Sequence, residues 1–447
     1  MIKPYDLVII GGGISGTALL YTLVNYSNIK NIALIEKYPK LAQVNSKLNN
    51  NSQTLHFGDI ETNYTLEKAK SVKRAATMVR NYILKHDKEK ETYSKTHKIV
   101  LAIGNKEVNE LEKRYREFKT LFPKMKKLNK KEIAKLEPEV FKRRDEKENI
   151  MAILGEEGYA IDFGALSRSF VKNSLELKKK KIDIFLNEKV IRIEKNKIKY
   201  KVLMENKELN AKAVAVTAGA HSLLFAKSLG YGKDYSLLMI SGNFYITSRK
   251  MVNGKIYTMQ NKKLPFAAVH ADPEVHDKNI TRFGPTAKML FMLERHNYKT
   301  IKEYFKSANL NLKAFKSFLK IVFDKTRFGY MFKNNLLFEI PILGKILFTK
   351  EARKIIPDIK ARDLTKARGY GGVRPQIVNT KTGELMLGEA KIIGDRIIFN
   401  MTPSPGASTC LKNAEEDAKN IVGFLGKNYK FNSNKFEKDF SSNFLNG

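Results

Sequence analysis

The amino-acid sequence predicts a mixed α/β fold in which two domains are interleaved along the chain. A strand, a glycine-rich turn, a helix and a second strand follow one another within residues 5–36, and a further strand-to-helix unit occupies residues 396–425. Between them, helical and strand-like patterns alternate, which is typical of βαβ units combined with strand-rich segments. We find no internal repeat and no linker rich in Pro or Gly, so the domains are expected to be interleaved rather than arranged in series.

The pattern within residues 5–36 is that of a dinucleotide-binding unit. Tyr5–Ile10 ends in a continuous β-prone apolar run, as expected for a buried parallel strand. The sequence Gly11-Gly12-Gly13-Ile14-Ser15-Gly16 follows and supplies the spacing G-x-G-x-x-G. Helix is expected over Thr17–Tyr26, and a second strand over Asn31–Glu36. The order of these elements is much more specific than the glycines alone, which also occur in ordinary tight turns.

Each position of this motif has a physical role. Gly11 permits the tight turn, Gly13 allows the backbone to approach a pyrophosphate, and Gly16 allows the helix to pack closely on the strand. The amides at the helix N-terminus, around Ser15, point at the phosphates. Glu36 ends the second strand and is expected to accept hydrogen bonds from an adenosine ribose. Its negative charge disfavours the 2′-phosphate of NADP, which leaves FAD or NAD.

A second glycine-containing turn near the C-terminus favours FAD. Arg396–Met401 is expected to be a strand that leads through Thr402–Thr409 into a helix over Lys412–Leu425. The N-terminus of such a helix can place backbone donors beside a flavin ring. The cofactor-binding residues expected in this turn are Pro405, Gly406, Ala407, Ser408 and Thr409. The alternative is an ordinary helix cap made by Ser408 or Thr409.

The composition excludes several classes of protein. The 447 residues include 82 Lys or Arg and 46 Asp or Glu, for a net charge of +36, and 43% of the residues are hydrophobic. This apolar fraction excludes a wholly disordered chain. The single Cys excludes an intramolecular disulfide and a multi-thiolate metal site, and it indicates a reducing compartment. No apolar run approaches the ~18 residues of a membrane-spanning helix, so we expect neither a spanning segment nor secretion.

The positive charge has three interpretations. It fits a nucleic-acid-binding protein, a protein that binds a membrane surface, or a lysine-rich chain encoded by A- and T-rich sequence. Lys far exceeds Arg, and Asn and Ile are abundant, which favours the third interpretation. Because the sequence has no basic low-complexity tail, zinc-finger spacing or RNP-like aromatic motif, we expect no nucleic-acid partner.

The chain resembles the malate:quinone oxidoreductases and, more broadly, FAD-dependent 2-hydroxyacid dehydrogenases such as L-2-hydroxyglutarate dehydrogenase. The resemblance covers nearly the whole chain. It lies in the N-terminal Gly11–Gly16 turn, in residues 49–56 with Asn63-Tyr64, in residues 158–164, in residues 266–270 with Phe283-Gly284-Pro285, in residues 372–376 and in residues 404–409. Gln53, where the hydroxyglutarate group tends to have Gly, and Gly406 in the last motif favour malate as the substrate.

The resemblance implies a Rossmann-like FAD-binding domain interleaved with an α+β substrate domain, the D-amino-acid-oxidase-like arrangement of two-domain flavoproteins. The FAD-binding domain is expected in residues 1–90, 150–225 and 365–447, and the substrate domain in residues 91–149 and 226–364. The resemblance also implies that the FAD is not covalently held. Further cofactor-binding residues are expected at Asn51, Ser52, Gln53, Val190 and Gly219.

The remaining patterns agree with this division of the chain. Strands are expected over Lys98–Ile103, Lys189–Glu194, Lys199–Met204 and Ala213–Thr217, and helices over Leu128–Glu139 and Phe163–Lys178. An Asn129-x-x-Glu132 capping box marks the start of the first of these helices.

Oxidation of a 2-hydroxyacid requires a base for the hydroxyl proton, and histidine is suited to this role because its pKa lies near neutrality. His56 follows the small, polar residues 51–54, and His270 is expected to end an apolar strand, Pro265–Val269. Both histidines fall on motif positions that the family uses around its active site. The alternative for each is a buried, hydrogen-bonded core histidine. Of the others, His86, His97, His276 and His296 lie in polar stretches, and His221 is expected to have a packing role.

Arg374 is the best candidate to bind a carboxylate of the substrate. Its planar guanidinium binds a carboxylate with two hydrogen bonds, and it follows Gly371 and Gly372, which permit close approach. The alternative is an ion pair with an acidic residue. Arg282 is a weaker second cation for a dicarboxylate. Cys410 is expected to be a packed residue, and no metal-binding motif is present.

The leading prediction is therefore an FAD-dependent oxidoreductase that oxidises (S)-malate to oxaloacetate and reduces a membrane quinone. The first alternative is an L-2-hydroxyglutarate dehydrogenase or oxidase, and the second is an amine or amino-acid oxidase that uses O₂. A different class of alternative is a basic protein that binds membrane or nucleic acid without catalysis. The sequence does not distinguish which histidine is the base.

Residues 299–368 carry 17 Lys or Arg and 6 Asp or Glu. Within them, Leu312, Phe315, Leu319, Val322 and Phe323 follow helical spacing, with Lys313, Lys316 and Lys320 on an adjacent face. Such a basic amphipathic helix can bind an anionic bilayer surface, and the apolar stretch Phe328–Phe348 follows it. We therefore expect peripheral association with the inner face of the cytoplasmic membrane, the alternative being an ordinary core-facing helix with solvated lysines.

Overall fold

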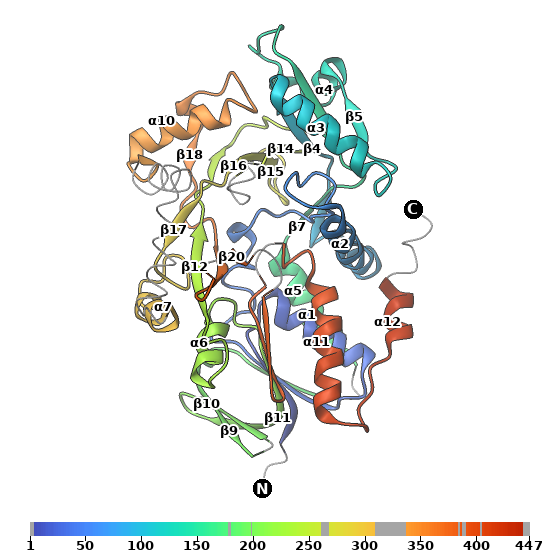
Figure 1. Ribbon diagram of the computed structural model, residues 1–447, viewed down its shortest axis with the longest axis vertical. Helices are drawn as coiled ribbons and strands as arrows, with labels where there is room; N and C mark the ends of the chain where they lie inside the picture. Colours follow the sequence, from blue (N-terminus) through green and yellow to red (C-terminus); the bar gives the residue numbers. More distant parts are fainter. Residues whose placement is uncertain are drawn as a thin grey trace.

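The N-terminal strand β1 (Tyr5–Ile10) is the centre of a largely parallel eight-stranded sheet in the computed structural model (Figure 1). It pairs in parallel with β2 (Asn31–Ile35) and β11 (Glu208–Val216), and the sheet continues in parallel to β8 (Lys181–Phe185) and β22 (Ile397–Asn400). The antiparallel strands of this sheet are β9 (Val190–Asn196), β10 (Lys199–Met204) and β21 (Lys391–Gly394). The structure describes residues 4–177, 180–197, 199–260, 268–308, 337–382, 385–386, 390–402 and 405–440.

Both faces of this first sheet are buried, which explains the continuous apolar run of β1. Successive side chains of a strand point to opposite faces. Leu7 packs in a core with helices α1 (Ile14–Tyr26) and α11 (Cys410–Leu425). Val8 packs on the opposite face in a second core that includes α6 (His221–Ser228). The parallel arrangement therefore places the ends of β1, β2 and β11 at one edge, where ligands of such sheets bind.

Further helices extend the layer that contains α1. Helix α5 (Phe163–Leu175) packs beside α1, and α2 (Leu66–His86) contacts α11 and α12 (Ser433–Phe440). Figure 1 shows α1, α5 and α11 together on one side of the first sheet, with α12 next to them.

A second eight-stranded sheet is built from widely separated segments. Its strands, in spatial order, are β18 (Thr365–Lys366), β13 (Tyr245–Thr247), β16 (Thr281–Gly284), β15 (His270–Pro273), β14 (Lys255–Thr258), β4 (Lys98–Ile103), β6 (Ile150–Leu154) and β5 (Lys126–Leu128). In the sequence, helices α3 (Asn105–Phe118) and α4 (Lys130–Leu136) lie between β4 and β6, and α10 (Pro341–Ala352) precedes β18. A third sheet has the order β17 (Lys288–Leu290), β12 (Tyr235–Ser241), β19 (Val373–Asn379) and β20 (Leu385–Met386), with α7 (Thr300–Ala308) against β12. Strands β3 (Tyr93–Lys95) and β7 (Tyr159–Ile161) form a separate pair.

Most of the predicted elements are present. The strand predicted at Lys98–Ile103 is β4, and the strands predicted at residues 5–10, 31–36, 199–204 and 396–401 are found to within a residue or two. The helix predicted at Leu128–Glu139 begins only at Lys130, because Leu128 pairs with Ala152 in β5 and Asn129 caps the helix. It ends at Leu136, two residues before Pro138, which disfavours helical backbone in the residue preceding it.

Two predictions concern segments that the structure describes only in part. His270 begins strand β15 rather than ending a strand, and residues 261–267 of the predicted strand lie outside the described residues. The amphipathic segment Leu312–Phe323 also lies outside the described residues. In the described part of the chain, no helix combines the length and the apolarity needed to cross a bilayer.

Several strands within the predicted FAD-binding segments pair outside the first sheet: Thr365–Lys366, Leu385–Met386 and Tyr159–Ile161 do so, and two longer strands do as well. Ile150–Leu154 pairs with β4 in the second sheet, and Val373–Asn379 pairs with β12 in the third sheet. The sequence assigned both segments to the FAD-binding domain. Each is a short apolar strand, and nothing in such a strand specifies which distant strand it pairs with.

A fully buried ion pair connects the second sheet to the loop after β2. Lys98 Nζ of β4 lies 2.6 Å from Asp59 Oδ1, and both side chains have no exposed surface. The Asp59 Oδ2 atom also accepts a hydrogen bond from the Glu156 amide at 3.1 Å. Removing one partner of such a pair leaves the other charge buried without compensation.

We therefore expect Lys98→Met to lower the free energy of unfolding by about 3–5 kcal/mol, as is typical when one partner of a buried pair is removed. Urea denaturation followed by circular dichroism measures this change. Lys127→Met is the matched control, because the Lys127 side chain is 46% exposed in its ion pair with Glu112. Similar losses in both variants would contradict a special contribution from the buried pair.

Candidate active site

A cavity of about 1120 Å³ begins at the ends of β1 and β2 and extends to strands of the second and third sheets. Its walls include the glycine turn after β1, the loop of residues 42–56, the start of β15 and the start of β19. Fifteen of the eighteen residues predicted for the site line this cavity: Gly11, Gly13, Ser15, Glu36, Asn51, Ser52, His56, Val190, Gly219, His270, Arg374, Pro405, Gly406, Ala407 and Ser408. The other three, Gly16, Gln53 and Thr409, do not.

Close packing around the turn after β1 requires glycine at two of its positions. Gly11 has a φ of +111°, and a Cβ atom on it would lie 2.6 Å from the carbonyl oxygen of Thr217. A Cβ atom on Gly16 would lie 2.0 Å from the Gly11 carbonyl oxygen, so Gly16 serves the contact between α1 and β1 rather than the cavity wall. Gly13 caps α1 without a side-chain hydrogen bond, the Ile14 amide donates to Ser46 Oγ at 3.0 Å, and residues 13–15 line the cavity.

Glu36 lies at the predicted position at the end of β2. Its two carboxylate oxygens accept hydrogen bonds from the amides of Gly12, at 2.8 Å, and Tyr38, at 3.0 Å. Burial raises the pKa of Glu36, and the two amides oppose this effect. A carboxylate held at this place by the backbone keeps lone pairs available for a ribose, which fits the dinucleotide expected from the motif.

Gln53 does not line the cavity, and its buried side chain instead stabilises the turn through hydrogen bonds. Its φ of +50° lies in the left-handed region that favours glycine. Its buried side chain accepts a hydrogen bond from the Val275 amide at 3.1 Å and donates one to the Leu48 carbonyl at 3.2 Å. The side chain therefore connects this turn to β15, which explains how a non-glycine residue is kept in this conformation. Thr409 is also buried, and its hydroxyl oxygen accepts a hydrogen bond from Asn413 in α11.

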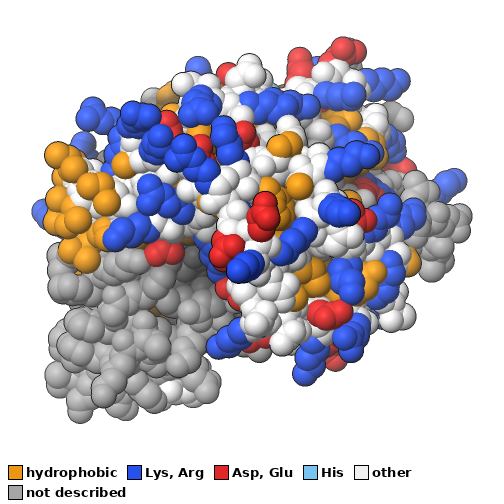
Figure 2. Space-filling model, turned by 90° about the horizontal axis from the view of Figure 1, so that it is seen from above, with side chains coloured by type: hydrophobic (Ala, Val, Ile, Leu, Met, Phe, Trp, Pro, Cys, Tyr) orange, Lys and Arg blue, Asp and Glu red, His pale blue; other side chains and the backbone are white. Residues whose placement is uncertain are grey.

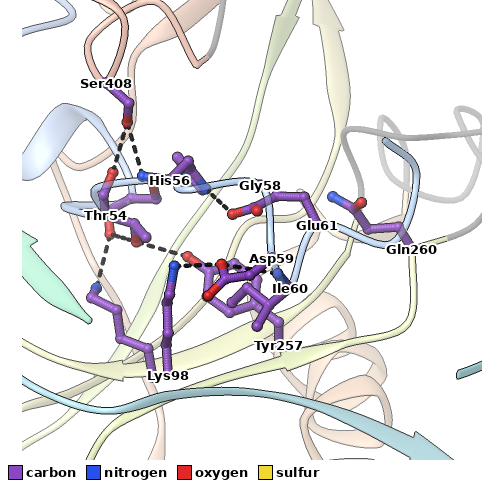
Figure 3. A network of polar contacts seen from close by, with 12 residues as sticks. Thr54, His56, Gly58, Asp59, Ile60, Glu61, Lys98, Tyr257, Gln260 and Ser408 are labelled. Atoms are coloured by element: carbon purple, nitrogen blue, oxygen red, sulfur yellow. Dashed lines mark hydrogen bonds and ion pairs between the residues drawn. The ribbon is translucent and has the colours of Figure 1, made fainter. Parts of the chain in front are cut away.

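His56 lines the cavity and is held on three sides (Figure 3). Its Nδ1 atom lies 2.6 Å from Glu61 Oε1, and its backbone amide donates to Ser408 Oγ at 3.0 Å. Its Nε2 atom is 3.4 Å from Ser52 Oγ, a long and weak contact. His56 and Lys98 together lower the pKa of Glu61 to about 2, although burial acts in the opposite direction.

His270 also lies beside Tyr257 and is almost fully buried. The ring centroids of His270 and Tyr257 are 4.8 Å apart, and those of His56 and Tyr257 are 6.4 Å apart. The His270 Nδ1 atom contacts Asp272 Oδ1. The other carboxylate oxygen of Asp272 lies 3.6 Å from Lys255 Nζ and 3.7 Å from Arg282 Nε, and all three of these side chains are fully buried.

Arg374 provides a cation that has no partner among the described residues. It lies in β19 opposite Ile240 and lines the cavity. Within the described part of the chain, its guanidinium forms no hydrogen bond and no ion pair, and burial lowers its pKa. Arg282, by contrast, does not line the cavity, because it donates to the Asn51 carbonyl at 2.9 Å and lies beside Asp272. Among the described residues, Arg282 therefore has an acidic neighbour and Arg374 has none.

The carboxylates that contact His56 and His270 were not predicted from the sequence. Asp272 lies two residues after His270 on the same strand, and a period of two places both side chains on one face, so this signal was available. Glu61 follows His56 by five residues in a loop, where no periodicity applies. His221 also departs from its expected packing role: its Nε2 atom lies 2.9 Å from Glu303 of α7, at the edge of the cavity near Gly219.

The position of Cys410 agrees with its expected packing role. Cys410 is buried at the start of α11, and burial raises the pKa of its thiol to about 12, as expected for a packed residue and not for a reactive thiolate. No group of three or more potential metal ligands occurs among the residues that the structure describes.

Comparison with known proteins assigns the chain to a family. Residues 3–416 match the model of the malate:quinone oxidoreductase (Mqo) family. The chain belongs to the malate:quinone oxidoreductase family. It is 45% identical to a probable malate:quinone oxidoreductase of Campylobacter jejuni, with 98% of this chain and 99% of the relative covered. It is 43% identical to the malate:quinone oxidoreductase of Helicobacter pylori, with 99% of both chains covered.

More distant relatives of this malate:quinone oxidoreductase family member agree with its resemblance to FAD-dependent 2-hydroxyacid dehydrogenases. The chain is 26% identical to a mitochondrial L-2-hydroxyglutarate dehydrogenase of Caenorhabditis briggsae, with 93% of this chain and 92% of the relative covered. The fold resembles an L-alpha-glycerophosphate oxidase of Mycoplasma pneumoniae, solved with FAD bound (TM-score 0.65, 16% identity, 95% and 96% covered). It also resembles a glycine oxidase of Geobacillus kaustophilus (TM-score 0.62, 14% identity, 93% and 94% covered). These neighbours confirm the predicted fold class.

The packing of Gly16 provides a test of the dinucleotide site. We expect Gly16→Val to push α1 away from β1 and to lower flavin affinity by more than about tenfold, because overpacking costs about 1–3 kcal/mol. The ratio of flavin to protein absorbance in the purified enzyme measures the effect. Gly423→Val in α11 is the matched control, because no atom lies within 4 Å of a Cβ at that position. Normal flavin content in Gly16→Val would contradict the assignment of this turn.

Proposed function

We propose that the protein is an FAD-dependent dehydrogenase that oxidises (S)-malate to oxaloacetate and passes the electrons to a membrane quinone. Membership of the malate:quinone oxidoreductase family supports the reaction. The observation that carries the proposal is the guanidinium of Arg374, which has no partner among the described residues and lies in the same cavity as the dinucleotide motif and two histidines paired with carboxylates.

The residues present fit FAD. The amides at the start of α1 would hold the pyrophosphate, and Glu36 would accept hydrogen bonds from the adenosine ribose. Residues 405–408, at the start of α11, would lie beside the ring system, because they share the cavity with His56 and His270. When bound, the flavin supplies the acceptor for the hydride of the substrate. The first sheet with its helices is the FAD-binding part in this proposal.

Arg374 is proposed to bind a carboxylate of malate. A guanidinium offers a planar pair of N–H donors that matches a carboxylate, and low surrounding polarity strengthens the interaction. Because Arg374 has no described protein partner, binding does not first require an ion pair to break. The hydroxyl group of the substrate is then proposed to lie near His56 or His270, either of which is able to accept a proton at Nε2 because its Nδ1 faces a carboxylate.

Anaerobic reduction of the flavin tests the substrate. We expect (S)-malate to bleach the flavin absorption of the purified enzyme and 2-hydroxyglutarate to bleach it more slowly. A pocket distinguishes one methylene by only about 1–3 kcal/mol, so the two rates are expected to differ by about 10–200-fold. Faster bleaching by 2-hydroxyglutarate would support the alternative substrate, and a protein that cannot be reconstituted with FAD would contradict the proposal.

The dependence of the reaction rate on malate concentration tests the role of Arg374. We expect Arg374→Met to raise the KM for malate by about 10–100-fold, since a charged hydrogen-bonded contact contributes about 1.5–3 kcal/mol. Arg374→Lys is expected to recover part of the loss. Arg368→Met is the control, because Arg368 is an exposed arginine six residues away. An unchanged KM in Arg374→Met would exclude the proposed role.

We further propose that helix α10 binds the enzyme to the inner face of the cytoplasmic membrane. The side chains of Ile340, Ile342, Leu343 and Ile346 are 46%, 76%, 38% and 44% exposed. Lys350 and Arg353 are exposed at the end of the same helix. Figure 2 shows hydrophobic side chains grouped at this edge of the molecule with Lys and Arg beside them. Exposed apolar side chains flanked by cations match an anionic lipid surface.

The position of α10 supports a route for quinone. Phe348, on its buried side, stacks on Tyr245 at a centroid distance of 4.3 Å. Glu339, just before the helix, accepts a hydrogen bond from Asn243 at 2.6 Å and from Lys288 at 2.7 Å. Asn243 precedes Phe244, which lines the cavity. A membrane bound at α10 would therefore lie near one wall of the cavity.

We expect the double variant Ile342→Glu with Ile346→Glu to lose most of its co-sedimentation with vesicles that contain anionic lipid, because it places two carboxylates against the lipid surface. Leu84→Glu in α2 is the matched control, since Leu84 is 49% exposed on a different helix. Malate-dependent flavin reduction in solution verifies that the double variant is folded. Unchanged vesicle binding of the double variant would contradict docking through α10.

A further inference from the structure

Two histidine–carboxylate pairs face the same tyrosine, and they differ in the charges behind them. His56 contacts Glu61 and His270 contacts Asp272, and both imidazole rings lie near the Tyr257 ring. In each pair the carboxylate contacts Nδ1, so a neutral histidine carries its proton on Nδ1 and keeps a lone pair on Nε2. The local hydrogen bonds alone therefore do not distinguish the two bases.

The charges around His56 are nearly balanced. Behind Glu61, the Asp59 carboxylate is paired with Lys98 at 2.6 Å, and Figure 3 shows this pair below the His56–Glu61 contact. Arg114 adds a cation, because its guanidinium donates to the carbonyl oxygens of Glu61 and Tyr64. The two carboxylates thus balance the two cations while His56 is neutral. A proton on His56 raises the total by one charge and faces the Glu61 carboxylate directly.

The charges around His270 are already positive. Lys255 and Arg282 both lie within 4 Å of Asp272, so two cations share one carboxylate while His270 is neutral. The remaining neighbours, Tyr257 and Phe244, carry no charge, since burial keeps the pKa of Tyr257 well above its ordinary value. Burial is the largest effect on the pKa of His270 and lowers it; the Asp272 carboxylate opposes this, Lys255 and Arg282 lower the pKa further, and the net shift is downward. A third positive charge in this fully buried group is therefore unfavourable.

Solvent access and hydrogen bonding agree with this difference. The side chain of His56 is 14% exposed to the cavity and that of His270 is 4% exposed. The contact of His56 Nε2 with Ser52 Oγ is long, at 3.4 Å, so a substrate hydroxyl is able to replace it without a large loss. Imidazolium formation at His56 is thus compensated by Glu61 at 2.6 Å and by partial contact with water.

We propose that His56 accepts the hydroxyl proton of the substrate, that Glu61 is its positioning residue, and that His270 stays neutral and only hydrogen-bonds the substrate. This assignment rests on the proposed function. The bound flavin would supply the acceptor for the C2 hydride, and His56 Nε2 would accept the O–H proton as the C–O bond becomes C=O. Glu61 stabilises the imidazolium that results. The two electrons and the proton of that hydride, together with the proton released from His56, would then reduce the quinone to quinol.

The pH dependence of flavin reduction tests the assignment. Because the base must be unprotonated, the rate constant for anaerobic reduction by malate is expected to rise with pH to a plateau. In Glu61→Gln the imidazolium loses its carboxylate, so the midpoint should move to lower pH by about 1–3 pH units. The plateau rate should fall by at least about tenfold, because a weaker base transfers the proton less effectively. Glu61→Asp should restore the midpoint toward the wild-type value.

His270→Gln is the comparison variant. It retains hydrogen-bonding capacity without a titrating ring, so the midpoint should be the same as in the wild type even though the rate changes. A midpoint that is unchanged in Glu61→Gln, or a pH dependence that disappears in His270→Gln, would overturn the assignment. Failure of the proposed function is distinguishable, since it would leave the wild-type flavin unreduced by malate at every pH. Flavin absorption verifies that each variant is folded, and Glu61→Asp alone retains the test if Glu61→Gln does not bind flavin.

Discussion

The arrangement of the site depends on how buried cations hold the segment of residues 51–61 against the second sheet. Arg282 donates to the Asn51 carbonyl at 2.9 Å, and Lys255 donates to the Ser52 carbonyl at 3.3 Å. Farther along the segment, Lys98 pairs with Asp59. These three basic side chains come from strands β16, β14 and β4 and have no exposed surface. A charge in such surroundings is tolerated only where a partner is close, so the segment has little freedom to move.

The same segment joins parts of the chain that are distant in sequence. The His56 amide donates to Ser408 at the start of α11, more than 350 positions away. Gln53 connects the segment to β15 through the Val275 amide. The cofactor side of the cavity and its reacting end are thus attached to one short stretch of backbone. Proton and hydride transfer need such fixed geometry, because reacting atoms must be held about 3–3.5 Å apart.

Charge is distributed differently at the two ends of the cavity. Near the dinucleotide motif, Glu294 is paired with Lys37, and Glu303 is paired with Lys189 and His221. At the reacting end, Arg374 is left without a described partner. The net charge of +36 is therefore less informative than the position of this one cation. The overall positive field draws dianions toward the protein, whereas Arg374 offers the specific contact for a carboxylate.

The sequence by itself determined the features that depend on neighbouring residues. The strand, turn and helix of the dinucleotide motif follow from local apolar runs and from glycines that backbone geometry requires, and Glu36, His56, His270 and Arg374 were identified by their places in short motifs. Only the tertiary structure decided which distant strands pair, so Ile150–Leu154 and Val373–Asn379 join sheets other than the one expected.

The charges behind each histidine were likewise decided only by the tertiary structure. Glu61, Asp272, Lys255 and Lys98 acquire their influence from burial and from partners far away in the chain. The reason is physical. Local backbone preference is encoded in adjacent residues, but the energy of a charge depends on everything that surrounds it once the chain has folded.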